Sequence, residues 1–415
     1  ACVAARFTLS GRAVTGDVTL AAKRTGRPLR LFLVAGEHSG DALGARLMPA
    51  LKERCASGVT FAGVGGDAME RQGLASIFPL HDVAVMGPIN ILAALPRLIR
   101  RVHQTVDAAI AFKPDAVVII DSPEFTHPIA KRIRKRAPDI PIIDYVSPSV
   151  WAWRPGRAKK MRGYIDEVLA LLPFEPAAHQ RLGGPHCTYV GHPLIERMDE
   201  IASAGTVDLA KRLGIAPGRD VLVVLPGSRR SEASRLLGVF GGTVKLLANK
   251  GSAFDVVIPT VPHLRGQVEA ASRTWGLPCH VVDGARDGFA AMRLARAALA
   301  ASGTVTLELA LCGTPMAVAY KVDALAAPFL RRMIKGETVV LANLVLGENA
   351  FPEFLQEDCT AEKLAPVLGE LLGKSARRDA QVAALARIPG KLKLADGDPS
   401  AAAAKAVLRE TDGRR

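Results

Sequence analysis

Short apolar runs alternate with longer amphipathic stretches along the chain from residue 29 onward. Runs such as 29–35 and 116–121 have the length of strands and lead into Gly, Pro, Ser or Asp. Strands that alternate with helical stretches are typical of a parallel sheet with crossover helices. The pattern therefore predicts an α/β protein, with further strands at 59–62, 140–146, 168–172, 188–190, 221–225, 254–258, 280–282, 297–300 and 316–319.

The alternation breaks once, after Gly191-His192-Pro193, and restarts at residue 221. A chain of 415 residues is long enough for two domains of ordinary size. We predict two doubly wound, Rossmann-like domains facing a cleft, at 29–195 and 206–375, followed by a helical tail at 376–415 that is a candidate for packing back on the first domain. Residues 1–28 show no clear periodicity and are predicted to be an extension outside the fold.

Composition narrows the class of protein. Hydrophobic residues make up 49% and charged residues 23%, which is globular usage and excludes disordered, collagen-like and coiled-coil chains. No apolar run reaches the roughly 18 residues that a membrane-spanning helix needs. The net charge of +14 favours anionic partners, either phosphorylated ligands, nucleic acid or an acidic membrane surface. With 5% aromatic residues and no recognisable nucleic-acid-binding module, we predict no nucleic-acid partner.

The sequence offers no metal site. Its six cysteines are scattered without a Cys-x-x-Cys pair, which indicates a reducing compartment, and its nine histidines form no metal-binding motif. Asp396-Gly397-Asp398 resembles the D-x-D of metal-dependent sugar transfer, but Pro399 follows it, as at the start of a helix. We therefore predict no metal and no cofactor.

Two glycine-rich turns lie in the first half. The segment 36–41 follows the first strand and precedes a helix, so Gly36, Ser39, Gly40 and Asp41 are predicted to form an acceptor or phosphate loop; a tight turn alone would also need the glycines. The segment 63–68 matches G-x-G-x-x-A, but it follows the second strand rather than the first. It is weak support for a nicotinamide-binding oxidoreductase, and a turn is the alternative.

Asp121 ends the most apolar strand of the first half, which places it at the carboxyl edge of the sheet, where ligands of open α/β sheets bind. A carboxylate there can act as a general base toward a hydroxyl group. Aspartate is equally favoured as the N-cap of a helix that begins with proline, here Pro123. Position alone supports both interpretations equally.

The second half carries two loops suited to a diphosphate. LPGSRRSE (225–232) follows its first strand, and ASGT (301–304) opens a predicted helix over 305–311. Both loops place backbone N–H groups and hydroxyls where an anion binds, and the first loop also places arginines there. Glu308 lies one turn into that helix, within reach of ribose hydroxyls, although an exposed helical glutamate is the simpler explanation.

Two further segments suggest contact with an amphiphilic substrate. The loop 145–162 holds Trp151 and Trp153 beside a run of basic residues, a combination that suits a sugar or acyl-phosphate ligand, with core packing as the alternative. Over 89–102, apolar residues recur at helical spacing while arginines lie off the stripe. We predict an amphipathic helix whose membrane face comprises Ile91, Leu92, Leu95, Leu98 and Ile99.

Together these segments resemble the lipid-A-disaccharide synthase family of inverting GT-B glycosyltransferases. The resemblance runs from about residue 31 to 357 and more loosely to the end. It rests on LVAGEHSGD (33–41), FAGVGGDAME (61–70), KPDAVVIIDSPEF (113–125), YVSPSVWAWRPGRAKKM (145–161), LALLPFEP (169–176), YVGHPL (189–194), LPGSRRSE (225–232), ASGTVTLELAL (301–311) and LANLVLGENAFPEFLQE (341–357).

The resemblance implies a reaction and a set of site residues. UDP-2,3-diacylglucosamine would donate its sugar to 2,3-diacylglucosamine 1-phosphate (lipid X), on the cytoplasmic face of the inner membrane of a Gram-negative bacterium, at an anionic lipid surface. It assigns catalysis to Asp121 and UDP binding to Arg229, Ser228, Ser302, Gly303, Thr304, Glu308 and Asn343. The chain departs from the family at Glu348-Asn349, where Arg-Glu is usual.

Other enzymes remain as alternatives. The peptidoglycan glucosaminyltransferase and UDP-sugar 2-epimerases would share the loops of the second half, but not the SPSVWAWRPGR string at 147–157. Oligomeric state and acyl-chain preference are left open by the sequence.

Overall fold

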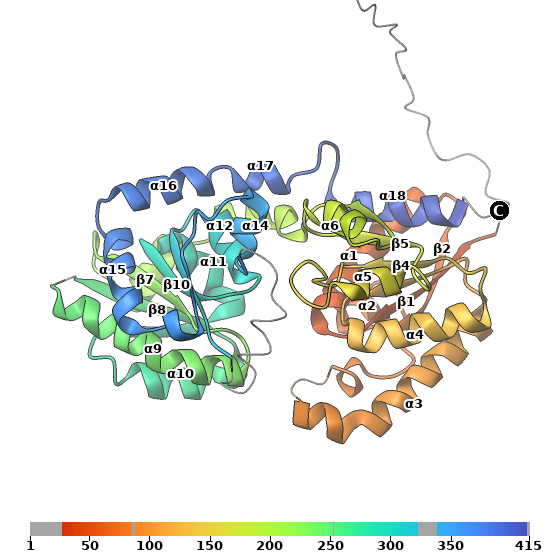
Figure 1. Ribbon diagram of the computed structural model, residues 1–415, viewed down its shortest axis with the longest axis horizontal. Helices are drawn as coiled ribbons and strands as arrows, with labels where there is room; N and C mark the ends of the chain where they lie inside the picture. The colour runs from red at the N-terminus through yellow and green to blue at the C-terminus, as the bar shows by residue number, and fades with distance from the viewer. Residues whose placement is uncertain (1–26, 85–87, 252, 323–337, 413–415) are drawn as a thin grey trace, which may run out of the picture.

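The computed structural model describes residues 27–84, 88–251, 253–322 and 338–412, and for residues 88–93 only the helical backbone. Two parallel six-stranded sheets form the framework, each flanked by helices (Figure 1). The predicted doubly wound α/β class is confirmed, and every predicted strand overlaps an observed one.

The first sheet has the order β2-β1-β3-β4-β5-β6. Strands β1 and β3 are buried on both faces, which explains why they appear in the sequence as continuous apolar runs. The strands are β1 (Leu29–Ala35), β2 (Val59–Val64), β3 (Ala116–Ile120), β4 (Ile142–Tyr145), β5 (Glu167–Ala170) and β6 (His186–Tyr189). The helices are α1 (His38–Arg54), α2 (Asp67–Arg71), α3 (Pro88–Phe112), α4 (Pro123–Arg136), α5 (Gly156–Met161) and α6 (Glu175–Arg181).

The second sheet has the order β12-β11-β10-β7-β8-β9. Its strands are β7 (Asp220–Leu225), β8 (Phe254–Thr260), β9 (Cys279–Asp283), β10 (Ala297–Ala301), β11 (Met316–Tyr320) and β12 (Glu353–Leu355). Strand β12 was not predicted, because three half-buried residues at a sheet edge leave no alternating pattern to detect. The helices are α9 (Arg230–Asn249), α10 (Arg265–Ser272), α11 (Gly284–Leu294), α12 (Val305–Leu311), α14 (Leu341–Leu346), α15 (Ala361–Leu372) and α16 (Ala376–Leu385).

Two segments connect the sheets. One carries α7 (Met198–Ser203) and α8 (Thr206–Leu213), whose Ile201 and Leu209 are buried, so the small and polar stretch of the sequence is helical here. The other carries α17 (Ile388–Leu392) and α18 (Pro399–Asp412), and α18 packs against α1 (Figure 1).

Glu196 joins both connecting segments to the first unit, which is the first sheet with its flanking helices. Its carboxylate accepts a hydrogen bond from Arg46 of α1 at 3.0 Å and another from the backbone N–H of Ser400 at 2.8 Å. The Tyr189 hydroxyl also donates to the carbonyl of Leu392, at 2.7 Å. Both connecting segments are thereby tied to the first sheet.

In each sheet the strand order reverses direction at one point, between β1 and β3 in the first and between β7 and β10 in the second. The loops that leave the carboxyl ends of neighbouring strands diverge there, and ligands of open α/β sheets bind in the resulting crevice. The loops at 36–41 and 121–123 occupy this position in the first sheet, and those at 226–229 and 302–304 in the second.

Candidate active site

Asp121 lies in a turn with unusual backbone geometry. Asp121 and Ser122 have φ angles of +57° and +49°, so two successive non-glycine residues adopt the left-handed conformation. Such residues cost about 1–3 kcal/mol each and cluster at functional sites. Helix α4 takes Ser122 as its N-cap, so Asp121 is not the cap that its position before Pro123 also suggested.

Both carboxylate oxygens of Asp121 are held by hydrogen bonds. The Ser39 hydroxyl donates to Oδ2 at 2.7 Å, and the backbone N–H of Ser122 donates to Oδ1 at 2.7 Å. The carboxylate is half-buried at the carboxyl edge of the sheet. It is therefore fixed in orientation while still open to a ligand.

Glycines let the start of α1 press against this turn. A Cβ atom on Gly36 would lie 2.5 Å from the Cβ of Ser122, and one on Gly40 would lie 2.8 Å from the carbonyl oxygen of Ile120. The Ser122 hydroxyl donates to Glu37 at 2.9 Å. Close packing of α1 on the β3 turn accounts for both glycines without a bound phosphate.

Asp41 faces the interior rather than the crevice. Its buried carboxylate accepts hydrogen bonds from the backbone N–H groups of Gly66, Ala68 and Met69 at 2.8–3.0 Å. This replaces the expectation that Asp41 contacts the acceptor, because both of its oxygens already bind the start of α2. It also removes the dinucleotide interpretation of 63–68, since a carboxylate occupies the place of a pyrophosphate.

The charge around Asp121 does not suit an anion. The carboxylates of Glu37 and Asp121 both lie at the N-terminus of α1, where an anionic ligand would otherwise be favoured. Like charges in close proximity repel, so this turn suits a neutral hydroxyl-bearing sugar better than a phosphate. The expectation of a phosphate loop at 36–41 is revised accordingly.

The tryptophan loop, residues 146–157, leaves β4 next to the turn after β3 and ends in the first residues of α5. The indole N–H of Trp151 donates to the buried carboxylate of Glu175 at 3.3 Å, and its ring meets Phe174 edge-on with centroids 5.2 Å apart. The backbone N–H of Leu172 also donates to Glu175, at 3.0 Å. Burial raises the pKa of Glu175 from 4.5 to about 7, although these two hydrogen bonds lower it.

In the second sheet, the Glu232 side chain hydrogen-bonds to the backbone of the loop that follows β7. Gly227 has a φ of +99°, and a Cβ atom there would lie 2.1 Å from the Glu232 carboxylate. That carboxylate accepts hydrogen bonds from the backbone N–H groups of Ser228 and Arg229, as the third helical residue does in a capping box. The Arg229 side chain is exposed, so it is this side chain that is available to a diphosphate.

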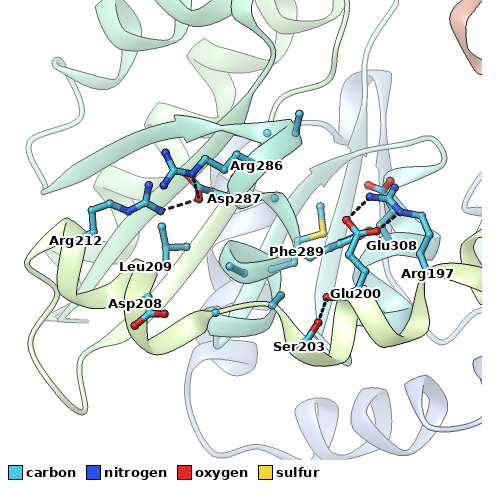
Figure 2. A pocket seen from close by; sticks show the side chains of 17 residues that line it. Arg197, Glu200, Ser203, Asp208, Leu209, Arg212, Arg286, Asp287, Phe289 and Glu308 are labelled. Atoms are coloured by element: carbon cyan, nitrogen blue, oxygen red, sulfur yellow. Dashed lines mark hydrogen bonds and ion pairs between the residues drawn. The ribbon is translucent and has the colours of Figure 1, made fainter. Parts of the chain in front are cut away.

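The loop after β10 precedes α12, whose Glu308 lines a cavity. Ser302 donates its hydroxyl to the carbonyl of Val339 at 2.9 Å, Thr304 is exposed, and Gly303 has a φ of +155°. One turn along α12, Glu308 lines a cavity of about 650 Å³ between α7, α8 and α11 (Figure 2). Burial raises the pKa of Glu308, and nearby Arg197 opposes this shift.

Arg197 lines the same cavity as Glu308 and was not among the predicted site residues. The guanidinium of Arg197 lies 4.5 Å from the ring centroid of Phe289 and is held by two hydrogen bonds to Glu200, each 2.8 Å long (Figure 2). Arg197 lies between the two sheets in the chain, and no motif marks it. Only the tertiary structure brings it beside Glu308.

Asn343 is buried and bonded to the backbone of Phe351. Its buried side chain donates to the carbonyl of Phe351 and accepts from the N–H of Phe351, both at 2.9 Å. It therefore braces the loop after α14, and contact between Asn343 and UDP stays a prediction. In the same loop, Glu348 occupies a position where the family usually has arginine, and it forms an ion pair with Arg387.

Helix α3 presents part of the predicted membrane face. Leu95 and Ile99 are 43% and 49% exposed, whereas Leu98 is half-buried against the hydrophobic core of the first sheet. The side chains of Ile91 and Leu92 lie outside the described residues. Arg97 and Arg100 are exposed. The exposed apolar face is thus narrower than expected, because the helix turns Leu98 inward.

Within the described ranges, no helix combines the length and apolar character needed to cross a bilayer. The same residues contain no group of three or more His, Cys, Asp or Glu side chains placed to hold a metal ion.

Solved structures with the same arrangement define the class. The UDP-GlcNAc 2-epimerase of Neisseria meningitidis, bound to UDP-GlcNAc, superposes with a TM-score of 0.63 at 13% identity, covering 93% of this chain and all of that one. MurG of Acinetobacter baumannii gives 0.56 at 15% identity, covering 92% and 100%. The fold is the GT-B architecture of glycosyltransferases.

Sequence comparison then specifies the family. The lipid-A-disaccharide synthetase family model matches residues 31–407. A lipid-A-disaccharide synthase of Rhodopseudomonas palustris is 48% identical over 400 residues, covering 96% of this chain and 98% of the relative, and one of Bradyrhizobium diazoefficiens is 50% identical over 379 residues, covering 91% and 96%. The chain belongs to the lipid-A-disaccharide synthase family and is a hexosyltransferase of lipid A biosynthesis.

Proposed function

We propose that this enzyme transfers 2,3-diacylglucosamine from its UDP conjugate to the 6-hydroxyl of 2,3-diacylglucosamine 1-phosphate, releasing UDP with inversion at the anomeric carbon. Residues 29–195 would bind the acceptor and residues 206–375 the UDP-sugar. The observation that carries this proposal is the oriented carboxylate of Asp121 at the switch point of the first sheet. Family membership supports the substrate class.

In this proposal Asp121 is the general base. It accepts the proton of the acceptor 6-hydroxyl as that oxygen bonds to the anomeric carbon of the donor. The bond from the anomeric carbon to UDP breaks at the same time, and the electron pair leaves with UDP through an oxocarbenium-like transition state. Because Ser39 and the Ser122 N–H already fix the carboxylate, little reorganisation is needed when the hydroxyl arrives.

UDP would lie along the switch point of the second sheet. Arg229, Ser228 and the loop Ser302-Gly303-Thr304 would face the diphosphate, and Glu308 would accept hydrogen bonds from the ribose hydroxyls. The cavity beyond Glu308 has room for the base, since small-molecule sites commonly measure about 300–1,000 Å³. Replacement of Glu308 by Gln should then weaken binding of uridine and UDP about equally in isothermal titration, whereas loss of affinity for UDP alone would place Glu308 at the diphosphate.

A transfer assay with radiolabelled donor tests the function. We expect a labelled disaccharide 1-phosphate only when both acylated sugars are present, and full activity after treatment with EDTA. Epimerisation of UDP-GlcNAc, or transfer to a peptidoglycan precursor, would contradict the proposal. Strict dependence on added Mg²⁺ or Mn²⁺ would contradict the metal-free mechanism.

We further propose that α3 holds the enzyme on the cytoplasmic face of the inner membrane. Both substrates carry acyl chains, so the enzyme must reach them at a lipid surface. Leu95 and Ile99 offer exposed apolar side chains, and Arg97 and Arg100 beside them complement anionic headgroups. Arg101, which the sequence placed in the same basic group, is instead paired with Asp82.

A further inference from the structure

Two arginines of the tryptophan loop converge on a single glutamate of α4. Arg157 forms an ion pair with Glu124 at 2.5 Å, and Arg154 lies 4.0 Å from the same carboxylate oxygen. The Arg154 guanidinium also stacks over the ring of Trp153, 5.1 Å from its centroid. The Glu124 side chain is 77% exposed, whereas that of Arg157 is only 18% exposed. Arg157 is thus held by packing, Arg154 is half exposed and rests on Trp153, and their carboxylate partner is open to solvent.

This group lies close to Asp121 in the chain. Glu124 is the second residue of α4, which begins directly after the turn formed by Asp121 and Ser122. The α1 side of Asp121 carries Glu37. The side toward the tryptophan loop carries Arg154 and Arg157, and the exposed Lys159 and Lys160 follow in α5. Positive charge beside Asp121 is therefore concentrated on the side of the tryptophan loop.

The acceptor has a fixed length between its reacting hydroxyl and its phosphate. The 1-phosphate is on C1 and the 6-hydroxyl is on the carbon attached to C5, and C1 and C5 flank the ring oxygen, so the phosphate site must lie within the width of one sugar ring from Asp121. A phosphate monoester is dianionic near neutral pH, and arginine binds it with paired, charge-assisted hydrogen bonds. Among the described residues, Arg154 and Arg157 form a basic pair at the start of α4, close in the chain to Asp121.

We propose that Arg154 and Arg157 bind the 1-phosphate of the acceptor, which displaces the carboxylate of Glu124. This inference rests on the proposed function, because it assumes that the acceptor hydroxyl meets Asp121. Glu124 holds the two arginines in place while the site is empty. Because the Glu124 side chain is 77% exposed, its carboxylate can move into water when a phosphate takes its place on the arginines.

The test compares two acceptors, 2,3-diacylglucosamine with and without its 1-phosphate. The parent enzyme should prefer the phosphorylated acceptor in kcat/KM, and the Arg154→Ala/Arg157→Ala variant should lose about 10- to 100-fold of that preference. The KM for the UDP-sugar and the affinity for UDP should stay unchanged. Equal loss on both acceptors, or a raised KM for the donor, would overturn the assignment.

Two single variants sharpen the test. Glu124→Gln removes the competing carboxylate, so it should lower the KM for the phosphorylated acceptor and leave that for the dephosphorylated one unchanged. Arg162→Ala removes a positive charge from an exposed position just beyond α5 and should keep the parental preference. A preference lost equally in Arg162→Ala would show a general effect of charge and refute a specific site.

Vesicle binding and the parental assay separate the remaining explanations. If the double variant binds anionic vesicles as well as the parent while losing its preference, the arginines recognise the substrate rather than the lipid surface. If its vesicle binding falls and its preference stays, the inference is wrong. Failure of the parent to form disaccharide from either acceptor would instead refute the proposed function itself.

Discussion

At the scale of single residues, the crevice of the first sheet shows how sequence neighbours can take opposite roles. Ser39 and Asp41 belong to one short motif, yet Ser39 binds the carboxylate of Asp121 while Asp41 turns inward to bind α2. The sequence could place Asp121 at the edge of the sheet, because a strand of five apolar residues ends there. It could not distinguish a base from a helix cap, since that depends on the left-handed backbone of Asp121 and Ser122.

Replacement of Asp121 by Asn tests the residue that we assign as the base. Asn keeps the size of the side chain and tolerates the left-handed backbone, but it cannot accept a proton. We expect kcat to fall by about 100-fold or more, with UDP affinity nearly unchanged. Steady-state kinetics and titration with UDP measure the two effects. Near-normal turnover in a folded Asp121→Asn protein would remove Asp121 from the mechanism.

At the scale of elements, buried strands were predictable because their apolar runs are short, continuous and bounded by turn residues. The helical segment at 198–213 was harder to recognise, since only Ile201 and Leu209 mark its buried side. Long-range partners such as Arg197 and Phe289, or Trp151 and Glu175, leave no local signal at all. These contacts exist only after the elements pack together.

The tryptophan loop should make stability depend on pH through Glu175. Its pKa is about 7 in the folded protein against an ordinary 4.5, mainly because of burial. The folded state therefore keeps a proton that the unfolded chain releases, and this contribution to the free energy of unfolding is present below pH 4.5 and is lost as the pH rises through 7. The loss amounts to about 3 kcal/mol at most.

Thermal or urea unfolding at several pH values measures this effect. The Glu175→Gln variant cannot titrate, so its stability should fall less than that of the parent between pH 5 and 7. Glu53→Gln, at an exposed position near the end of α1, is the matched control and should follow the parent. Identical pH profiles for the parent and Glu175→Gln would show that Glu175 is already ionised in the fold across this range.

At the scale of the whole molecule, the family motifs and the alternation of strands and helices were together sufficient to predict the GT-B architecture. They did not reveal which face of α3 is exposed, because that depends on how the helix rotates over the core. The stripe predicted from spacing divides between two faces, with Leu98 turned to the core and Leu95 and Ile99 turned to solvent.

The double variant Leu95→Ser/Ile99→Ser tests the proposed membrane face. It should reduce binding to anionic vesicles by about tenfold or more, while UDP binding stays intact. Binding of the parent should also weaken at high salt, because Arg97 and Arg100 contribute through screened charges. Val207→Ser/Val382→Ser removes two other exposed apolar side chains and should behave as the parent. Unchanged vesicle binding of the α3 variant in a sedimentation assay would place the lipid-facing surface elsewhere.

Helix α18 constrains how the polypeptide is made. Its residues Ala403, Ala404 and Val407 are buried in the same core as β1 and α1, so the first unit lacks part of its interior until α18 has been synthesised. Ser400 and Glu196 are 204 residues apart, and ribosomes add about 5–20 residues per second, so roughly 10–40 s separate the two in synthesis. During that interval the apolar surface that α18 will cover stays exposed on the nascent first unit, and such surface makes an incomplete chain prone to aggregate.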